Sequence, residues 1–146
     1  MTVLIDADGC PVVDITVKLT NQTGLNCVII CDTSHAFEKE GAKTVIVPKG
    51  NDSVDFTLVN MIQKGDIVIT QDYGLAAMCL ARGAVPVNQN GMIYNENNID
   101  GLLMQRYTAK KIRMSGGRLK GPSKRLPEQN TAFEKTLIKL INGLLE

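Results

Sequence analysis

The chain has 146 residues, of which 44% are hydrophobic and 21% charged, and its formal net charge is +1. A chain of this length buries roughly two-thirds of its unfolded surface, which predicts one domain over residues 1–146. No apolar stretch approaches the ~20 residues that a membrane helix needs, and the acidic start is unlike a signal peptide. We therefore expect a soluble cytoplasmic protein with no membrane partner.

The small net charge conceals an uneven distribution along the chain. Residues 1–100 carry 6 Lys or Arg and 12 Asp or Glu, a net charge of −6, whereas residues 101–146 carry 10 and 3, a net charge of +7. Eight of the basic residues lie within 101–127, which holds no acidic residue. This asymmetry predicts a polyanion-binding surface beside an acidic one. A pair of solvated helix faces is the plainer alternative.

The first predicted element is a buried strand that ends in two acids. Val3–Ile5 is an apolar run without a polar break, which is typical of a strand covered on both faces. Asp6 and Asp8 follow, then Gly9 for a tight turn and Pro11, a residue suited to the first position of a helix. Because ligands bind outside the carboxyl ends of parallel strands, this pattern predicts half of an acidic site.

The next stretch, residues 11–23, fits two patterns. Apolar and polar residues alternate as in a strand, whereas Pro11 at the entrance and Gly24 at the exit favour a helix. We predict the helix, because parallel strands need a crossover between them. Two further strands are predicted at 26–32, which ends in an acid, and at 42–47.

The rest of the chain continues to alternate between strands and helices. An amphipathic helix is predicted over 53–64, ended by Gly65, and a strand over 66–72. A short helix around Leu75, Met78 and Cys79, closed by Gly83, is followed by a strand over 84–87 and a strand or hairpin remnant over 91–94. Two helices come last, one with an apolar stripe at Ile99, Leu102, Leu103 and Tyr107 and one over 128–145. A basic segment rich in Gly and Pro, 113–127, separates the last two helices. This order predicts an α/β fold, a three-layer α/β/α sandwich around a mostly parallel sheet.

Four carboxylates are expected at one edge of that sheet. Asp6 and Asp8 follow the first strand, Asp72 ends the strand over 66–72, and Asp55 lies in the first turn of the helix before it; Asp52 is a fifth candidate. Each has a structural explanation as a helix cap, a partner of a helix dipole or a turn residue. Together they would repel one another unless cations neutralise them, and Mg²⁺ or Mn²⁺ prefers such oxygen ligands.

The cysteines indicate neither zinc nor nucleophilic chemistry. Cys27 and Cys31 stand near His35, but an apolar strand separates them and the spacing matches no zinc pattern. Cys10 lies at a helix start, where a thiol pKa can fall, but no histidine stands near it in sequence. We expect these three cysteines and Cys79, the fourth in the chain, to be reduced structural thiols.

Several of these stretches resemble known families. Ile69–Gly83 resembles the Thr-x-Asp-x-x-Leu-Ala…Gly signature of PIN-like nucleases. The whole chain more closely resembles the YaiI/YqxD family of small bacterial proteins, through Asp6–Val12, Thr70–Ala76 and Arg113–Pro122. One departure from the family pattern is Gln129, four residues before Phe133, where an acid is expected. The last helix is therefore not expected to join the acidic site.

Ile5–Asp8 and the helix at Val54–Asp55 occupy the other acidic positions of the PIN-like superfamily, so the resemblance implies a role for each matching residue. Asp6, Asp55 and Asp72 would hold Mg²⁺ or Mn²⁺, and Asp8 would assist them as a fourth catalytic residue. The metal would activate a water molecule for attack on a phosphodiester. Basic side chains would hold the backbone of a nucleic acid, RNA in preference to DNA; these are Lys110, Lys111, Arg113, Arg118, Lys120, Lys124 and Arg125.

Two other functions remain open from the sequence. The first is a nucleic-acid-binding module that keeps the basic surface but does not cleave. The second is a phosphatase of the haloacid-dehalogenase type, which the Asp6-x-Asp8-Gly9 motif resembles. That family has Thr or Val at the position of Cys10 and needs a later pair of neighbouring acids. Asp66 and Asp72 stand about 20 Å apart on one strand, so they cannot share a metal.

Overall fold

The computed structural model describes residues 1–35, 38–50, 52–117 and 124–145. The strands are β1 (Thr2–Asp6), β2 (Asn26–Asp32), β3 (Lys43–Val47), β4 (Ile67–Ile69) and β5 (Val85–Val87). The helices are α1 (Val13–Thr23), α2 (Ser53–Met61), α3 (Tyr73–Ala81), α4 (Ile99–Met114) and α5 (Pro127–Leu145), with a short 3₁₀ turn at Thr33–His35. The predicted alternation of strands and helices is confirmed.

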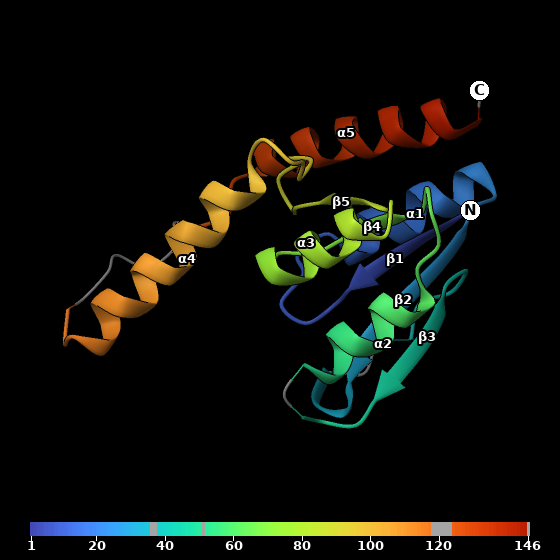
Figure 1. Ribbon diagram of the computed structural model, residues 1–146. Helices are drawn as coiled ribbons and strands as arrows, with labels where there is room; N and C mark the ends of the chain where they lie inside the picture. Colours follow the sequence, from blue (N-terminus) through green and yellow to red (C-terminus); the bar gives the residue numbers. More distant parts are fainter. Residues whose placement is uncertain (36–37, 51, 118–123, 146) are drawn as a thin grey trace.

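The five strands form one parallel sheet in the order β3-β2-β1-β4-β5 (Figure 1). The chain first builds the sheet outward from β1 to β3 and then returns to the other side of β1 to add β4 and β5. The crossovers on the two sides of β1 therefore lead away from each other, and a crevice opens at the carboxyl ends of β1 and β4. This is the edge to which the sequence assigns the acidic site.

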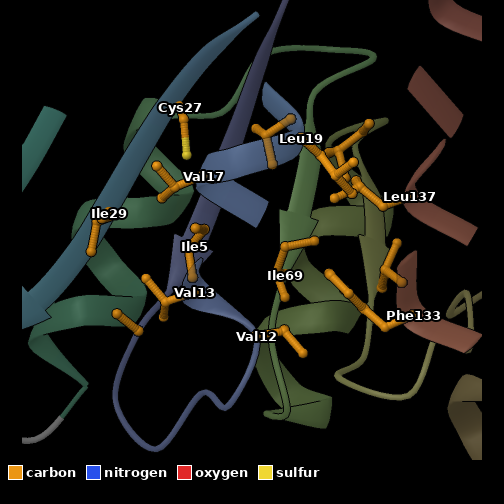
Figure 2. Close-up of a cluster of buried hydrophobic side chains, with 14 of the residues drawn as sticks. Ile5, Val12, Val13, Val17, Leu19, Cys27, Ile29, Ile69, Phe133 and Leu137 are labelled. Carbon is orange, nitrogen blue, oxygen red and sulfur yellow. The ribbon is translucent and has the colours of Figure 1, made fainter. Parts of the chain in front are cut away.

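Helices cover both faces of the sheet, as the predicted three-layer sandwich requires. Alternate residues of β1 point to opposite faces: Val3 and Ile5 belong to a core shared with α1 and α5, whereas Leu4 belongs to a core shared with α2 and α3. Figure 2 shows the first core, in which Phe133 and Leu137 of α5 lie over the sheet beside side chains from α1. Since both layers are apolar, the strands contain the unbroken apolar runs from which they were predicted.

Helix α1 resolves the ambiguity of residues 11–23 in favour of a helix. The polar residues that suggested a strand include Thr16 and Thr20, and both are fully buried. Their hydroxyls donate hydrogen bonds to carbonyl oxygens of the preceding helical turn, at 2.8 and 2.9 Å. Because these hydroxyls are bonded within the helix, the two threonines are buried like apolar side chains. Pro11 lies two residues before the helix and not in its first position.

The predicted helix over 53–64 and the predicted strand over 66–72 are both too long, and Asp66 explains the two boundaries that face each other. The helix over 53–64 ends at Met61, before Gly65, and the strand over 66–72 shrinks to Ile67–Ile69. The Asp66 carboxylate accepts hydrogen bonds from the backbone amides of Gln63 and Thr2, at 2.9 and 3.1 Å. These bonds fix a turn between the helix and the strand, so neither element extends through it.

Helix α4 is only partly packed. Its first turns contact α3 through Ile99, Leu102 and Leu103. The predicted apolar stripe is wrong beyond Leu103, because Tyr107 is 58% exposed, and the helix projects away from the sheet (Figure 1). In the described part of the chain, no helix is long and apolar enough to cross a membrane.

Helix α5 is docked on the turn that follows β5. Ile93 in this stretch forms a single antiparallel bridge with Val87, which is all that exists of the predicted hairpin at 91–94. Gly91 has a φ of +87°, its carbonyl accepts a hydrogen bond from Thr136 at 2.8 Å, and a Cβ there would lie 2.6 Å from the carbonyl oxygen of Ala132. Only glycine combines this backbone conformation with this close approach.

We predict that Gly91→Ala destabilises the fold by about 1–3 kcal/mol, because the new methyl group pushes α5 off the turn. Gly24→Ala is the matched control. Gly24 also has a positive φ, of +72°, but no atom lies within 4 Å of the added Cβ. Chemical denaturation should show a clearly larger loss for Gly91→Ala than for Gly24→Ala. Equal losses would mean that the cost is backbone strain alone.

Candidate active site

A polar cavity of about 530 Å³ opens at the carboxyl ends of β1 and β4. Its lining brings together all four predicted catalytic carboxylates from separate parts of the chain. The lining residues are Asp6, Asp8, Gly9, Asp32, Gly50, Asp52, Ser53, Val54, Asp55, Gln71, Asp72, Tyr73 and Arg106. We call this cavity the acidic pocket.

Thr70 joins the two strand ends that carry the principal acids. Its Oγ1 donates a hydrogen bond to Asp6 Oδ2 at 2.8 Å and accepts one from the backbone amide of Asp72 at 3.0 Å. The backbone carbonyl of Thr70 accepts a hydrogen bond from the Tyr94 hydroxyl at 3.1 Å, beneath the pocket. The threonine thereby holds Asp6 in one orientation and places Asp72 next to it.

Asp72 caps helix α3 and also lines the acidic pocket. It is the N-cap of α3, and its Oδ1 accepts hydrogen bonds from the amides of Gly74 and Leu75 at 2.8 and 3.1 Å. Arg106 of α4 donates to the same oxygen at 3.3 Å. A Cβ on Gly74 would lie 3.3 Å from Oδ1 and 3.4 Å from the arginine, so glycine leaves room for this ion pair.

Crowding and burial make two of the acids weak. Burial raises the pKa of Asp6 to about 6, with repulsion from Asp72 and Asp8 adding to the rise and the Thr70 hydrogen bond opposing it. Burial also raises the pKa of Asp55 to about 7, and repulsion from Asp72, Asp6 and Asp52 adds to it. In its protonated form Asp55 donates a hydrogen bond to Asp72, which raises the pKa further. The pocket thus holds more carboxylate than it can ionise freely at neutral pH.

The remaining acids of the pocket come from its rim. Asp52 precedes α2 in the left-handed conformation, with a φ of +61°, and its side chain makes no capping hydrogen bond. The predicted capping role of Asp52 is therefore wrong. Asp32 at the end of β2 accepts a hydrogen bond from the amide of Ser34 at 2.8 Å and also lines the pocket.

The donor chemistry of the pocket fits a hard divalent cation. In the described part of the chain, no three His, Cys, Asp or Glu side chains already stand as a ready-made metal site. The pocket nevertheless gathers Asp6, Asp55 and Asp72, which supply oxygen donors only, and repulsion among them contributes to both raised pKa values. A divalent cation would relieve that repulsion, so these three residues fit Mg²⁺ or Mn²⁺ by charge and by donor type.

The predicted nucleic-acid-binding residues fall into three groups. Lys110, Lys111 and Arg113 are exposed on α4, and Lys124 is exposed before α5. Arg118 and Lys120 lie outside the described residues. Arg125 differs from the others because three of its five N–H donors bond within the protein: it donates to Asn130 Oδ1, Asn90 Oδ1 and the carbonyl of Gln89, at 2.8, 2.8 and 2.7 Å. It ties the start of α5 to the turn after β5.

Sequence reasoning missed three residues that shape the acidic pocket. Arg106 was one unassigned basic residue among eight, and only the packing of α4 on α3 brings it to Asp72. Thr70 stood inside the PIN-like motif without an assigned role. Asp32 ends a predicted strand, so the rule applied to Asp6 and Asp72 would have found it.

The cysteines are structural, as predicted. All four are free thiols; Cys27, Cys31 and Cys79 are buried in the core. Burial raises the pKa of Cys10 to about 11, because desolvation outweighs the hydrogen bond from the Val12 amide. A thiol with this pKa is protonated at neutral pH, which disfavours Cys10 as a nucleophile.

We predict that the metal-free protein loses stability as the pH rises from 5 to 8. The folded pKa values of Asp6 and Asp55 are about 6 and about 7, against 3.8 for a free carboxyl. The folded state therefore binds more protons than the unfolded state between about pH 4 and pH 7, and this stabilisation disappears as the pH passes through the folded pKa values. Thermal melts in EDTA measure the change.

Asp55→Asn should flatten this dependence, because an amide does not titrate. The exposed Asp100→Asn, in the first turn of α4, is the control and should keep the wild-type slope. A melting temperature in EDTA that rises between pH 5 and pH 8 in the wild type would contradict the raised pKa values.

The chain has many relatives over nearly its full length. It is 47% identical over 141 residues to a UPF0178 protein of Exiguobacterium sibiricum, covering 97% of this chain and 96% of the relative. It is 49% identical over 141 residues to a UPF0178 protein of Ruminiclostridium cellulolyticum, covering 97% and 92%.

A solved structure of a variant of Rae1 (YacP) from Bacillus subtilis aligns over 98% of both chains, with 11% identity and a TM-score of 0.46. Residues 4–143 match the family described as "Uncharacterized BCR, YaiI/YqxD family". With that match and the two relatives, the resemblance found in the sequence is confirmed: the chain belongs to the YaiI/YqxD (UPF0178) family.

Proposed function

We propose that this protein is a metal-dependent nuclease that hydrolyses phosphodiester bonds in RNA or DNA, with RNA preferred. The observation that carries the proposal is the convergence of Asp6, Asp55 and Asp72 in one pocket, where two of them have pKa values of about 6 and about 7. Carboxylates concentrated in this way favour cation binding. The PIN-like motif within Ile69–Gly83 supports the same reaction class, and we propose that superfamily for the chain.

In this proposal Asp6, Asp55 and Asp72 hold one or two Mg²⁺ or Mn²⁺ ions. The metal would supply an activated water and charge stabilisation for phosphodiester hydrolysis. Thr70 orients Asp6 through the 2.8 Å hydrogen bond, so that its second oxygen, Oδ1, is presented in a fixed direction. Asp8 adds negative charge on the same wall and assists without being a principal ligand.

The basic residues supply binding. Arg106 reaches the acidic pocket, and its side chain is 60% exposed while it pairs with Asp72. Further along α4, Lys110, Lys111 and Arg113 extend a positive surface away from the pocket. A strand lying on this surface would have its phosphates led toward the acids, and phosphate contacts give affinity without sequence selectivity. The four free cysteines suit a reducing compartment, and we propose the cytoplasm.

A second candidate is a nucleic-acid-binding module without catalysis. The contact between Arg106 and Asp72 favours it, because this ion pair already neutralises part of the acidic charge. The phosphatase alternative is weakened by Asp66, whose carboxylate bonds to the amide of Thr2 at the opposite end of the sheet from the acidic pocket. Asp66 and Asp72 cannot share a metal.

We predict that Asp6→Asn and Asp72→Asn each abolish cleavage of labelled single-stranded RNA in Mn²⁺ or Mg²⁺, because each removes a metal-binding charge. Loss by about a hundredfold or more is expected for a group that stabilises the transition state. Asp8→Asn should cost less.

Asp100→Asn is again the surface control and should cleave like the wild type. Wild-type protein that binds RNA but cleaves no strand with either metal would favour the binding module. Cleavage that survives Asp72→Asn would point to another site or a contaminating enzyme.

We predict that replacing Lys110, Lys111 and Arg113 by glutamine weakens RNA binding and flattens its salt dependence. Each lost phosphate contact lowers the slope of log affinity against log salt by about 0.7 for a single strand, so the three together lower it by about two. Fluorescence anisotropy over a range of salt concentrations measures the slope.

The control carries the same change of charge on the opposite side of the sheet. Lys18 of α1 and Lys135 and Lys139 of α5 are exposed, and glutamine at these three positions should leave the slope unchanged. Equal slopes for the two triple variants would show that α4 is not the binding surface.

A further inference from the structure

A second cavity adjoins the acidic pocket. Its volume is about 420 Å³, and it shares Gly9 and Gln71 with the acidic pocket, so the two cavities have a common wall. Its lining is dominated by amide side chains and holds no acid. The lining residues are Gly9, Pro11, Gln71, Gln89, Asn90, Arg125 and Gln129. We call it the amide pocket.

Three of these amides are held in place by one hydrogen bond each. Gln71 Nε2 donates to the carbonyl of Gly9 at 2.9 Å, Gln129 Oε1 accepts from the amide of Leu126 at 2.7 Å, and Asn90 Oδ1 accepts from Arg125 at 2.8 Å. Each bond uses one end of the amide group. The other end of the Gln71 amide is its oxygen, a hydrogen-bond acceptor. The other ends of the Asn90 and Gln129 amides are NH₂ groups, which are donors.

Gln89 provides the observation that points to a ligand. Its Oε1 is buried, and among the described residues nothing donates a hydrogen bond to it. Its backbone is fixed at the same time, because its carbonyl accepts a hydrogen bond from Arg125 at 2.7 Å. A buried acceptor without a donor is unfavourable for folding alone, and a bound water, ion or ligand that donates to it removes this cost.

The chemistry of the amide pocket selects the kind of ligand. Among the described lining residues Arg125 carries the one charge, and three of its five N–H donors already bond within the protein, so the lining suits a neutral polar group better than a phosphate. Amide groups pair with the mixed donors and acceptors on the edges of nucleobases. The ring of Pro11 adds apolar surface. A cavity can enclose a base only when that base is unstacked, as bases in single strands can be.

We propose that the amide pocket binds one unstacked nucleobase of the strand whose phosphodiester lies in the acidic pocket, an inference that rests on the proposed nuclease function. The shared wall at Gly9 and Gln71 makes the two cavities neighbours, as a nucleotide requires of sites for its base and its phosphate. The phosphate contacts on α4 supply affinity, and the amide pocket supplies selectivity for the base.

The test compares single-stranded oligonucleotides that differ in one central base, including an abasic version. Binding is measured in EDTA by fluorescence anisotropy, so that no strand is cut. Unneutralised acids repel the phosphates of every strand alike, so repulsion lowers all affinities without changing their order. The wild type should prefer one base to the abasic site by about tenfold, the discrimination expected of one good amide–base pair.

Gln89→Leu is the diagnostic variant. It removes a buried acceptor that no described residue satisfies, so its melting temperature should equal or exceed that of the wild type. The ratio of the affinities for the preferred base and for the abasic site should nevertheless fall toward one. The slope of log affinity against log salt, which reports phosphate contacts, should stay the same. The exposed Gln22→Leu on α1 is the matched control and should keep the preference.

The outcomes separate this inference from the proposed nuclease function. Equal affinity of the wild type for all bases and the abasic strand would overturn the amide pocket, whether or not the protein cleaves. A preference that survives in Gln89→Leu would also overturn it. A base preference lost in Gln89→Leu, in a protein that cleaves nothing, would support the amide pocket and refute the nuclease. Even if the variant fails to fold, equal wild-type affinity for all strands still overturns the inference.

Discussion

The constraint on which this structure depends is the repulsion between carboxylates at the end of a buried parallel sheet. Asp6 and Asp72 leave adjacent strands at the same edge, and Asp55 reaches the same pocket from α2. The fold offsets this repulsion in three ways: the Thr70 hydroxyl donates to Asp6, helix amides and Arg106 donate to Asp72, and Asp55 takes up a proton at a pKa of about 7. A divalent cation would replace that proton. The residues that keep the metal-free pocket stable are thus those we propose as its ligands and their supports.

Arg106 is the residue through which the basic helix α4 contacts the acidic pocket. The first turns of α4 are anchored on α3, whereas the rest of the helix is solvent-exposed and carries Lys110, Lys111 and Arg113. The ion pair with Asp72 therefore lies where the positive helix joins the acidic pocket. A projecting basic helix gains little from folding by itself, and we propose that it extends a surface that attracts a polyanion. This arrangement explains why the chain is acidic over residues 1–100 and basic beyond them.

The last helix has a different relation to the site. Gly91, Thr136 and Arg125 dock α5 on the turn after β5, and that turn presents Gln89 and Asn90 to the amide pocket. Where the family pattern has an acid, Gln129 lines the amide pocket and not the acidic one. The docking of α5 thereby builds a neutral hydrogen-bonding cavity on the far side of the wall formed by Gly9 and Gln71. Phosphate and base would then be bound by separate parts of the chain.

The sequence by itself determined the features that depend on local pattern. Unbroken apolar runs predicted parallel strands, the acids after them predicted Asp6 and Asp72 at one edge, and glycine at 24 ended the first helix. These signals are local, because periodicity and chain punctuation report burial and strand ends directly. The tertiary structure alone decided the strand order, the arrival of Arg106 at Asp72, and the use of Arg125 as a clamp for α5. These contacts join residues far apart in the chain, and they depend on how helices pack on the sheet, which no local pattern encodes.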